Sequence, residues 1–163
     1  MVTAPAAPIR GACLLNLDDV ERVIVIDRAH TGRSRRHFFE KRFAAAKAHP
    51  DDFIHVGVHR GGALRGFATA RILRGEFGRD SAVAVLDAFG VEPASQEQGV
   101  GQALVEEMVR ILGRMGVRLL QSEADWTNRD LLRFFDASGF ALAPRLAMER
   151  SVVALLDEAI EEV

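Results

Sequence analysis

The chain has 163 residues, 48% hydrophobic and 27% charged, a composition typical of a soluble globular protein and unlike that of a disordered or fibrous one. Its 21 basic and 23 acidic side chains give a net charge of -2, so no overall positive field would attract nucleic acid or an anionic membrane. The single cysteine cannot form an internal disulfide, and we find no signal peptide or membrane-length apolar run. These features predict a cytoplasmic protein that binds neither nucleic acid nor membrane.

The length fits one domain with its own core. Residues 1–8, rich in Ala and Pro, are expected to be a flexible tail, and residues 9–163 a single domain. Residues 10–15 are predicted as its first strand. No internal repeat or linker divides the rest, so a mixed α/β domain is predicted.

Two helices are predicted before the main sheet. The first covers residues 15–30, where apolar side chains recur at helical spacing, and Asn16 or Asp18 is its candidate N-cap. The second lies within residues 32–50, with Ser34 as a candidate cap, and ends before Pro50. Its apolar side is formed by Phe38, Phe39 and Phe43.

From Phe53 the apolar period changes from near four to two, which indicates strands. Three consecutive strands are predicted at residues 53–60, 63–75 and 81–91, with a turn at Gly61 and Gly62 between the first two.

Helices and strands alternate in the last third of the chain. Residues 101–115 are predicted as a helix because Leu104, Met108 and Leu112 fall on one apolar stripe. The remaining predicted elements are a strand at residues 117–124, a helix at 128–138 ended by Gly139, a strand pair or bent strand at 140–153, and a short acidic helix at the end.

A proline turn and two glycines lie between the third strand and the next helix, in the letters Val91-Glu92-Pro93 and Gln96-x-x-Gly99-x-Gly101. Strand, glycine loop and helix N-terminus together form an anion site, because unpaired amides converge there and the helix dipole favours negative charge. The alternative is a plain turn with glycines at positive φ.

Two nucleotide-binding motifs are excluded by the same letters. A dinucleotide fingerprint needs a third glycine where this chain has Leu104, and a P-loop needs a lysine that is absent near the turn. What remains is a diphosphate held almost wholly by backbone amides.

These motifs resemble the GNAT superfamily of N-acetyltransferases, whose signature is Gln or Arg, two residues, Gly, one residue, then Gly or Ala after a Val-x-Pro turn. A second family motif follows in Asn128, the pair Phe134–Phe135, and Gly139–Phe140. The resemblance covers residues 82–150. It implies a central, mostly antiparallel twisted sheet flanked by about four helices, and an enzyme that transfers the acetyl group of acetyl-CoA to a primary amine of a small molecule or peptide. It also allows a homodimer.

The resemblance implies where acetyl-CoA would bind. The backbone of the strand end would pair with the pantetheine arm, and amides of the glycine turn would bind the pyrophosphate. The implied cofactor residues are Phe89, Gly90, Val91, Gln96, Gln98, Gly99, Val100, Gly101, Gln102, Ala103, Asn128 and Phe135.

Two carboxylates are candidates for the base that accepts the amine proton. Asp87 interrupts an alternating apolar face, so burial is expected to raise its pKa and suit it to this role. The alternatives for Asp87 are an ion pair with an arginine such as Arg71 on the preceding strand, or a position at the solvated end of the strand. Glu123, on the next strand, is the second candidate.

Phe135 occupies the position of the family's usual general acid, a tyrosine, and the chain has no tyrosine at all. The leaving thiolate must therefore be protonated by another group or by water. Ser122, Ser138 and Cys13 have suitable chemistry. The loss of the tyrosine also leaves open a CoA-binding sensor or interaction module without catalysis.

Other residues have structural alternatives. Thr127 and Asp130 resemble a capping box, with Asn128 then at the first helical position, and Trp126 is expected in or beside the core. A basic run (Arg33, Arg35, Arg36, Lys41 and Arg42) could steer an acidic acceptor or be a solvated helix face. The spacing of the histidines, including His55 and His59, predicts no metal site.

Overall fold

The computed structural model describes residues 12–151. The chain divides into two compact units, Met1–Asn128 and Arg129–Val163, and each is described by itself. The expected tail at residues 1–8 and the acidic helix at the C-terminus lie outside the described residues. The single domain over residues 9–163 stays a prediction.

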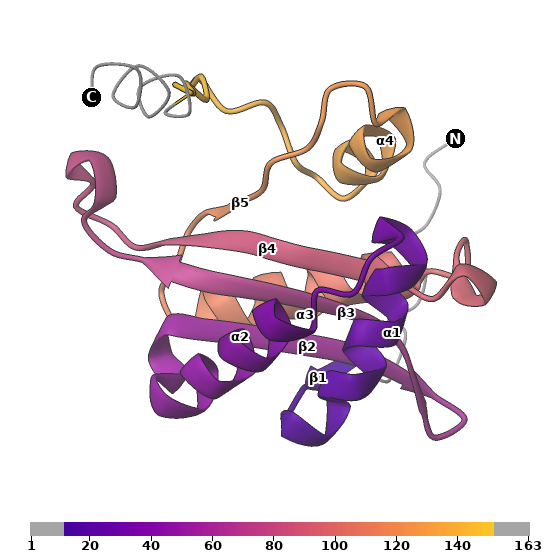
Figure 1. Cartoon of the computed structure of the whole chain (residues 1–163). Helices are drawn as coiled ribbons and strands as arrows, with labels where there is room; N and C mark the ends of the chain where they lie inside the picture. The colour runs from indigo at the N-terminus through magenta and orange to yellow at the C-terminus, as the bar shows by residue number, and fades with distance from the viewer. Residues whose placement is uncertain (1–11, 152–163) are drawn as a thin grey trace, which may run out of the picture. The chain divides into compact units, whose positions relative to one another are not determined.

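The first unit is built on a five-stranded sheet in the order β1-β2-β3-β4-β5 (Figure 1). Neighbouring strands are antiparallel, except that β4 and β5 are parallel. The strands are β1 (Ala12–Leu14), β2 (Phe53–Arg60), β3 (Ala63–Leu73), β4 (Val83–Val91) and β5 (Leu120–Gln121). The mixed α/β class and the mostly antiparallel sheet are confirmed, although β5 is shorter than the predicted strand at 117–124.

Four α-helices are described: α1 (Val20–Thr31), α2 (Arg36–Ala48), α3 (Val100–Arg114) and α4 (Arg129–Ala137). In Figure 1, α1 and α2 lie on one face of the sheet and α3 on the other. Short 3-10 turns precede α1 (Leu17–Asp19) and α3 (Pro93–Ser95). The α4 helix belongs to the second unit.

The helix starts differ in part from those predicted. Asn16 accepts a hydrogen bond from the Asp18 amide and forms a capping box with Asp19, but it caps the 3-10 turn that leads into α1. The residue before α1 itself is Asp19, whose side chain makes no cap hydrogen bond, so neither Asn16 nor Asp18 is the cap of α1. The prediction that Ser34 caps α2 was wrong, because the residue before α2 is Arg35 and no side chain caps that helix.

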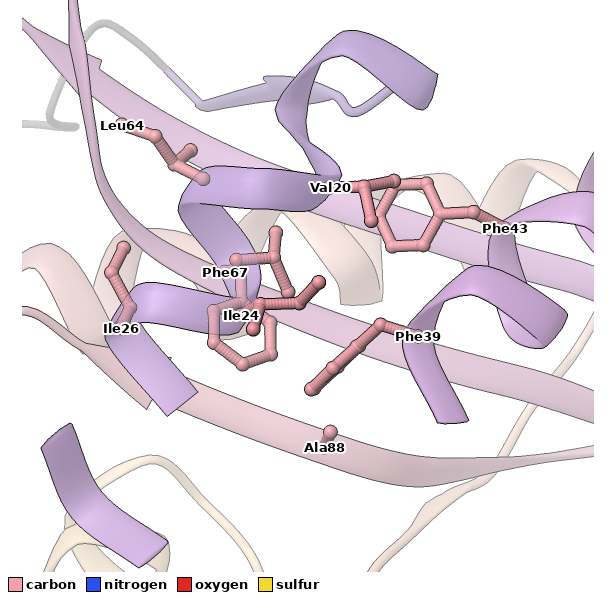
Figure 2. Close-up of a cluster of buried hydrophobic side chains, with 9 residues drawn as sticks. Val20, Ile24, Ile26, Phe39, Phe43, Leu64, Phe67 and Ala88 are labelled. Atoms are coloured by element: carbon pink, nitrogen blue, oxygen red, sulfur yellow. The ribbon is translucent and has the colours of Figure 1, made fainter. Parts of the chain in front are cut away.

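The core between α1, α2 and the sheet is aromatic and aliphatic (Figure 2). Phe39 is fully buried and meets Phe67 of β3 edge to face, with ring centroids 5.5 Å apart. Burying one such side chain contributes about 1.5 to 3 kcal/mol. The small residue Ala88 of β4 completes this cluster below Phe39, so α2 lies over β4 near Asp87.

On the other face, α3 packs closely on β3 at Gly66. A Cβ at Gly66 would lie 2.7 Å from Cγ1 of Val100 and 3.2 Å from Cδ1 of Leu104. A side chain there would push the first turn of α3 off the sheet. Gly66 therefore fixes the height of the α3 N-terminus above β3.

A β-bulge interrupts β4 at Asp87. Thr69 lies opposite Ala88, whereas the next residue of β3, Ala70, lies opposite Leu86. Asp87 therefore has no residue opposite it, and the bulge breaks the alternation of side chains along the strand.

Predictions for residues 140–151 were wrong, because this segment contains no strand. The Arg145 amide donates to the Ala143 carbonyl at 2.8 Å, so a tight turn at Pro144 breaks the extended run. Proline also lacks the amide that a ladder needs. Apolar content alone suggested a strand there.

Candidate active site

The turn after β4 is held by Glu92. Its carboxylate pairs with Arg22 of α1 and with Arg65 of β3 at 2.7 Å, and it accepts a hydrogen bond from Ser95 Oγ at 3.2 Å. The hydrogen bond from Arg65, with those from Arg22 and Ser95, lowers the pKa of Glu92. Strand, turn and α1 are thus tied together where the glycine loop begins.

The loop into α3 leaves backbone amides without internal partners. Glu97 and Gly99 have left-handed φ values of 58° and 77°, a conformation that is strained for the non-glycine residue. Within residues 12–151, the amides of Gly99, Val100 and Gly101 donate to no recorded acceptor. They are the orphan donors of a helix start, where the dipole favours an anion.

Two of the predicted loop residues have other roles. The Ala103 amide donates to the Gly99 carbonyl at 3.1 Å, so the helix itself uses this amide and it is no longer a candidate donor to the diphosphate. Gln96 is exposed, and its amide donates to Pro93.

Arg60 places a positive charge at this loop, which sequence reasoning missed. From the end of β2, its guanidinium donates to the carbonyl of Gln98 at 3.1 Å and to its side-chain oxygen at 3.2 Å. Gln98 in turn donates to the Ala94 carbonyl at 2.9 Å. No signal in the chain predicted this contact, because 38 residues separate Arg60 from Gln98.

Beyond Val85, β4 leaves its parallel neighbour. In the described chain, the two strands are paired only at Ala84↔Leu120 and Val85↔Gln121, whereas β4 continues to Val91. The Val91 carbonyl accepts a hydrogen bond from Nε2 of His30 at 2.6 Å, so that ring nitrogen carries a proton. The later part of β4, including Phe89 and Gly90, thus has an edge without a β5 ladder.

Asp87 is buried and lies between two arginines. Its side chain is 7% exposed, with Oδ1 3.1 Å from Nε of Arg71 and Oδ2 3.1 Å from Nη2 of Arg42. The Arg42 contact lacks hydrogen-bond geometry. Burial raises the pKa of Asp87, and the charges of Arg42 and Arg71 oppose this rise only in part. The expected burial is confirmed, and so is the ion pair with Arg71; Arg42 was missed because it appeared only in a basic run.

Two more polar side chains are buried beside Asp87. His55 of β2 lies opposite Thr69 of β3, and Thr69 lies opposite Ala88. Within the described chain, His55 Nε2, Thr69 Oγ1 and Asp87 Oδ2 have no hydrogen-bond partner. Burial, aided by the charge of Arg42, lowers the pKa of His55 to about 4. His55 is therefore neutral near pH 7.

Two other candidate catalytic residues, Glu123 and Cys13, do not contact Asp87 in the described chain. Glu123 is exposed beyond β5 and makes no recorded contact in the described part of the chain. Cys13 is on β1, three strands from β4, or roughly 14 Å at the usual strand spacing. Its Sγ lies 3.6 Å from Nδ1 of His59.

Thr127 is not the cap of α4. Its hydroxyl and amide both donate to Oδ1 of Asp125, at 2.6 and 2.8 Å, in an Asx-type turn. The helix begins at Arg129, so Asn128 precedes it. Trp126, expected near the core, is 87% exposed. In the second unit, Phe135 packs on Phe140 with centroids 4.8 Å apart.

Residues 19–140 match the model of the Acetyltransferase (GNAT) family. The chain belongs to this family. Over 109 residues it is 28% identical to the ribosomal protein bS18-alanine N-acetyltransferase of Escherichia coli K12, covering 65% of this chain and 68% of the relative. The corresponding enzyme of Shigella flexneri matches equally.

Solved structures share the GNAT fold. A transcriptional regulator from Bacillus halodurans C-125 has a TM-score of 0.74 at 18% identity, covering 86% of this chain and 97% of that one. The aminoglycoside acetyltransferase AAC(6')-Iy, in complex with a CoA-based bisubstrate analogue, has a TM-score of 0.70 at 20% identity, covering 86% and 96%. The family model confirms the family predicted from the glycine turn, and this GNAT chain is an acetyltransferase by family.

Among residues 12–151, no three His, Cys, Asp or Glu side chains come together in a way that could hold a metal ion. No helix of that part is long and apolar enough to span a bilayer.

Proposed function

We propose that this GNAT protein is an acetyl-CoA-dependent N-acetyltransferase. The acetyl group would pass directly to a primary amine while both substrates are bound, without a covalent intermediate on the protein. The observation that carries the proposal is the set of amides at Gly99, Val100 and Gly101, which have no internal acceptor in the described chain.

Three features of the site support binding of the cofactor. Acetyl-CoA supplies an acetyl thioester, an extended arm and a diphosphate. The three amides and the α3 dipole would hold the diphosphate, and Arg60 would add a positive charge beside Gln98. The edge of β4 beyond Val85 would pair with the arm in the manner of an added strand. Asn128 and Phe135 are kept as proposed cofactor contacts.

The acceptor amine must lose a proton, and we assign the proton acceptor role to Asp87. Freeing a lysine amine of pKa ~10.4 at pH 7 costs about 4 to 5 kcal/mol, whereas an α-amino group of pKa ~8 costs about 1 kcal/mol. The raised pKa of Asp87 makes it a better base than an exposed carboxylate. Glu123 is the alternative base, acting through solvent.

Thiolate departure needs no tyrosine in this proposal. Phe135 has no hydroxyl, and Cys13 lies on the far edge strand of the sheet. A thiol of pKa ~8.5 leaves readily as a thiolate near neutral pH, so the proton would come from water.

Isothermal titration with acetyl-CoA tests the proposal. We expect saturable binding with a sub-millimolar dissociation constant, followed by CoA release when an amine panel is added. A protein that gives no binding heat at sub-millimolar acetyl-CoA would lack the proposed function.

A second function follows from Phe135 in place of the family tyrosine. The protein would then be a CoA-binding sensor or interaction module. Binding of acetyl-CoA without CoA release across a broad amine panel supports this function, and steady release with any amine rejects it.

A further inference from the structure

A pocket lies along one face of α2. Its volume is about 280 Å³, and it is lined by Phe38, Lys41, Arg42 and Ala45. The spacing of three and four residues places these side chains on one helix face. The ring of Phe38 and the methyl of Ala45 make part of the lining apolar, and both charges in the lining are positive.

These charges are less neutralised than those of neighbouring basic residues. Arg35 pairs with Asp27, and Arg36 pairs with Glu21. By contrast, Lys41 has no recorded acidic partner in the described chain. The basic run is thus mostly internally paired, and Lys41 is the exception within the pocket.

Arg42 connects the pocket to the buried carboxylate. It lines the pocket and lies 3.1 Å from Asp87, which is also 3.1 Å from Arg71. Arg42 and Arg71 therefore share the single carboxylate of Asp87, and Lys41 adds a third positive charge to the pocket lining. Neutral His55 adds no charge, so the region keeps an excess of positive charge near pH 7.

The sheet below α2 carries buried polar atoms close to Arg42. Asp87 Oδ2, His55 Nε2 and Thr69 Oγ1 are buried without hydrogen-bond partners within residues 12–151. His55 lies under α2, since its ring centroid is 4.4 Å from that of Phe43. Unsatisfied buried polar atoms on three adjacent strands are unusual in a structural core.

We propose that the amine acceptor of this protein carries an acid group, a carboxylate or phosphate, which Lys41 and Arg42 bind while the amine approaches Asp87. This inference rests on the proposed acetyl transfer and names its substrate class. A polycation such as a polyamine or aminoglycoside would place several positive charges beside three others, and so is disfavoured.

Four dipeptide amides with the same amino terminus test the inference: Ala-Glu, Ala-phosphoserine, Ala-Gln and Ala-Lys. Calorimetry measures their binding to the protein saturated with CoA, and CoA release from acetyl-CoA measures turnover. We expect at least tenfold tighter binding and higher kcat/KM for an acidic dipeptide than for Ala-Gln, with Ala-Lys weakest. The two acidic dipeptides separate a carboxylate site from a phosphate site.

Charge reversal identifies the surface responsible. Lys41→Glu should remove or reverse the preference for the acidic dipeptides over Ala-Lys. Lys47→Glu, on α2 but outside the pocket lining, is the control and should preserve this preference. Equal results for the four dipeptides, including no binding to any, overturn the inference, as does an unchanged preference in Lys41→Glu. Failure of CoA binding itself would instead contradict the proposed function, and the dipeptides would then be compared on the CoA-free protein.

Discussion

Oδ2 of Asp87 on β4 lies 3.1 Å from Nη2 of Arg42 on α2. This contact joins the bulge in the strand that would hold the pantetheine arm to the pocket that would hold the acceptor. The aromatic packing of α2 on the sheet keeps the two residues together, since Phe39 and Ala88 belong to one buried cluster. Core packing thus positions the chemical groups.

Replacing Asp87 with Asn should lower kcat by about 10²- to 10⁴-fold, the usual contribution of a general base. Acetyl-CoA affinity should stay unchanged, because the substitution leaves the backbone of β4 and the amides at the start of α3 in place. Steady-state kinetics and calorimetry measure the two effects. Asp80→Asn, at an exposed carboxylate, is the matched control. Normal kcat in Asp87→Asn together with a large loss in Glu123→Gln would transfer the base role to Glu123.

Replacing Arg60 with Gln should weaken acetyl-CoA binding several-fold, since one partly exposed charge contributes about 1 kcal/mol or less. The variant should also bind with a weaker dependence on salt. Calorimetry at two ionic strengths gives both values. Arg74→Gln is the control, because Arg74 pairs with Asp52 at the other end of the β2–β3 hairpin. Equal losses in the two variants would count against a role for Arg60.

His55 should make stability depend on pH. Its pKa is about 4 in the folded protein against 6.5 ordinarily, so between these values the unfolded chain binds more protons. Stability should therefore fall as the pH drops from 6.5 through 4, by at most about 3 kcal/mol from this residue. Urea unfolding at pH 7 and pH 4 measures the loss in the free energy of unfolding. This loss should be smaller in His55→Phe than in the wild type, and it should be the same as in the wild type in His37→Gln, at an exposed site. Parallel curves for wild type and His55→Phe would refute this assignment.

Cys13 should be a slow thiol at neutral pH. Cys13 is exposed, but partial desolvation of its thiol, followed by the charges of Asp19 and Glu107, raises its pKa, so little thiolate is present. The rate of iodoacetamide alkylation should reach half its maximum above the ordinary value of ~8.5, and Asp19→Asn should lower that midpoint. Because the chain has one cysteine, mass spectrometry reads the rate directly. Glu106→Gln, on the exposed side of α3, is the control and should leave the pH midpoint of alkylation unchanged. An unchanged midpoint in Asp19→Asn would contradict the assigned cause of the raised pKa.

Local patterns predicted the regular elements well. The spacing of apolar residues and the turn residues between elements located α1, α2, α3 and the three long strands. Each of these elements buries one regular face, so its own residues carry the signal. The strand predicted at 140–153 failed for the opposite reason: apolar content was read without a partner strand, and Pro144 turns the chain. The two-residue β5 likewise depends on its pairing with β4.

The glycine turn and Asp87 could be found from the chain because each breaks a local pattern. Arg42 and Arg60 could not. Arg42 looks like one charge in a basic run, and Arg60 like a residue at a strand end. Their partners are set by the packing of α2 and by the height of α3 over Gly66. Such long-range contacts have no local signal.

The proposed function requires that the amides of Gly99, Val100 and Gly101 hold the diphosphate of acetyl-CoA. A titration of ¹⁵N-labelled protein with acetyl-CoA, followed by amide NMR, tests this contact. We predict that the resonances of these three amides show large, saturable chemical-shift changes and that their hydrogen exchange slows. Pantetheine, which lacks the diphosphate, should leave these resonances unshifted. Saturable binding of acetyl-CoA that leaves the three amides unchanged would contradict the claim.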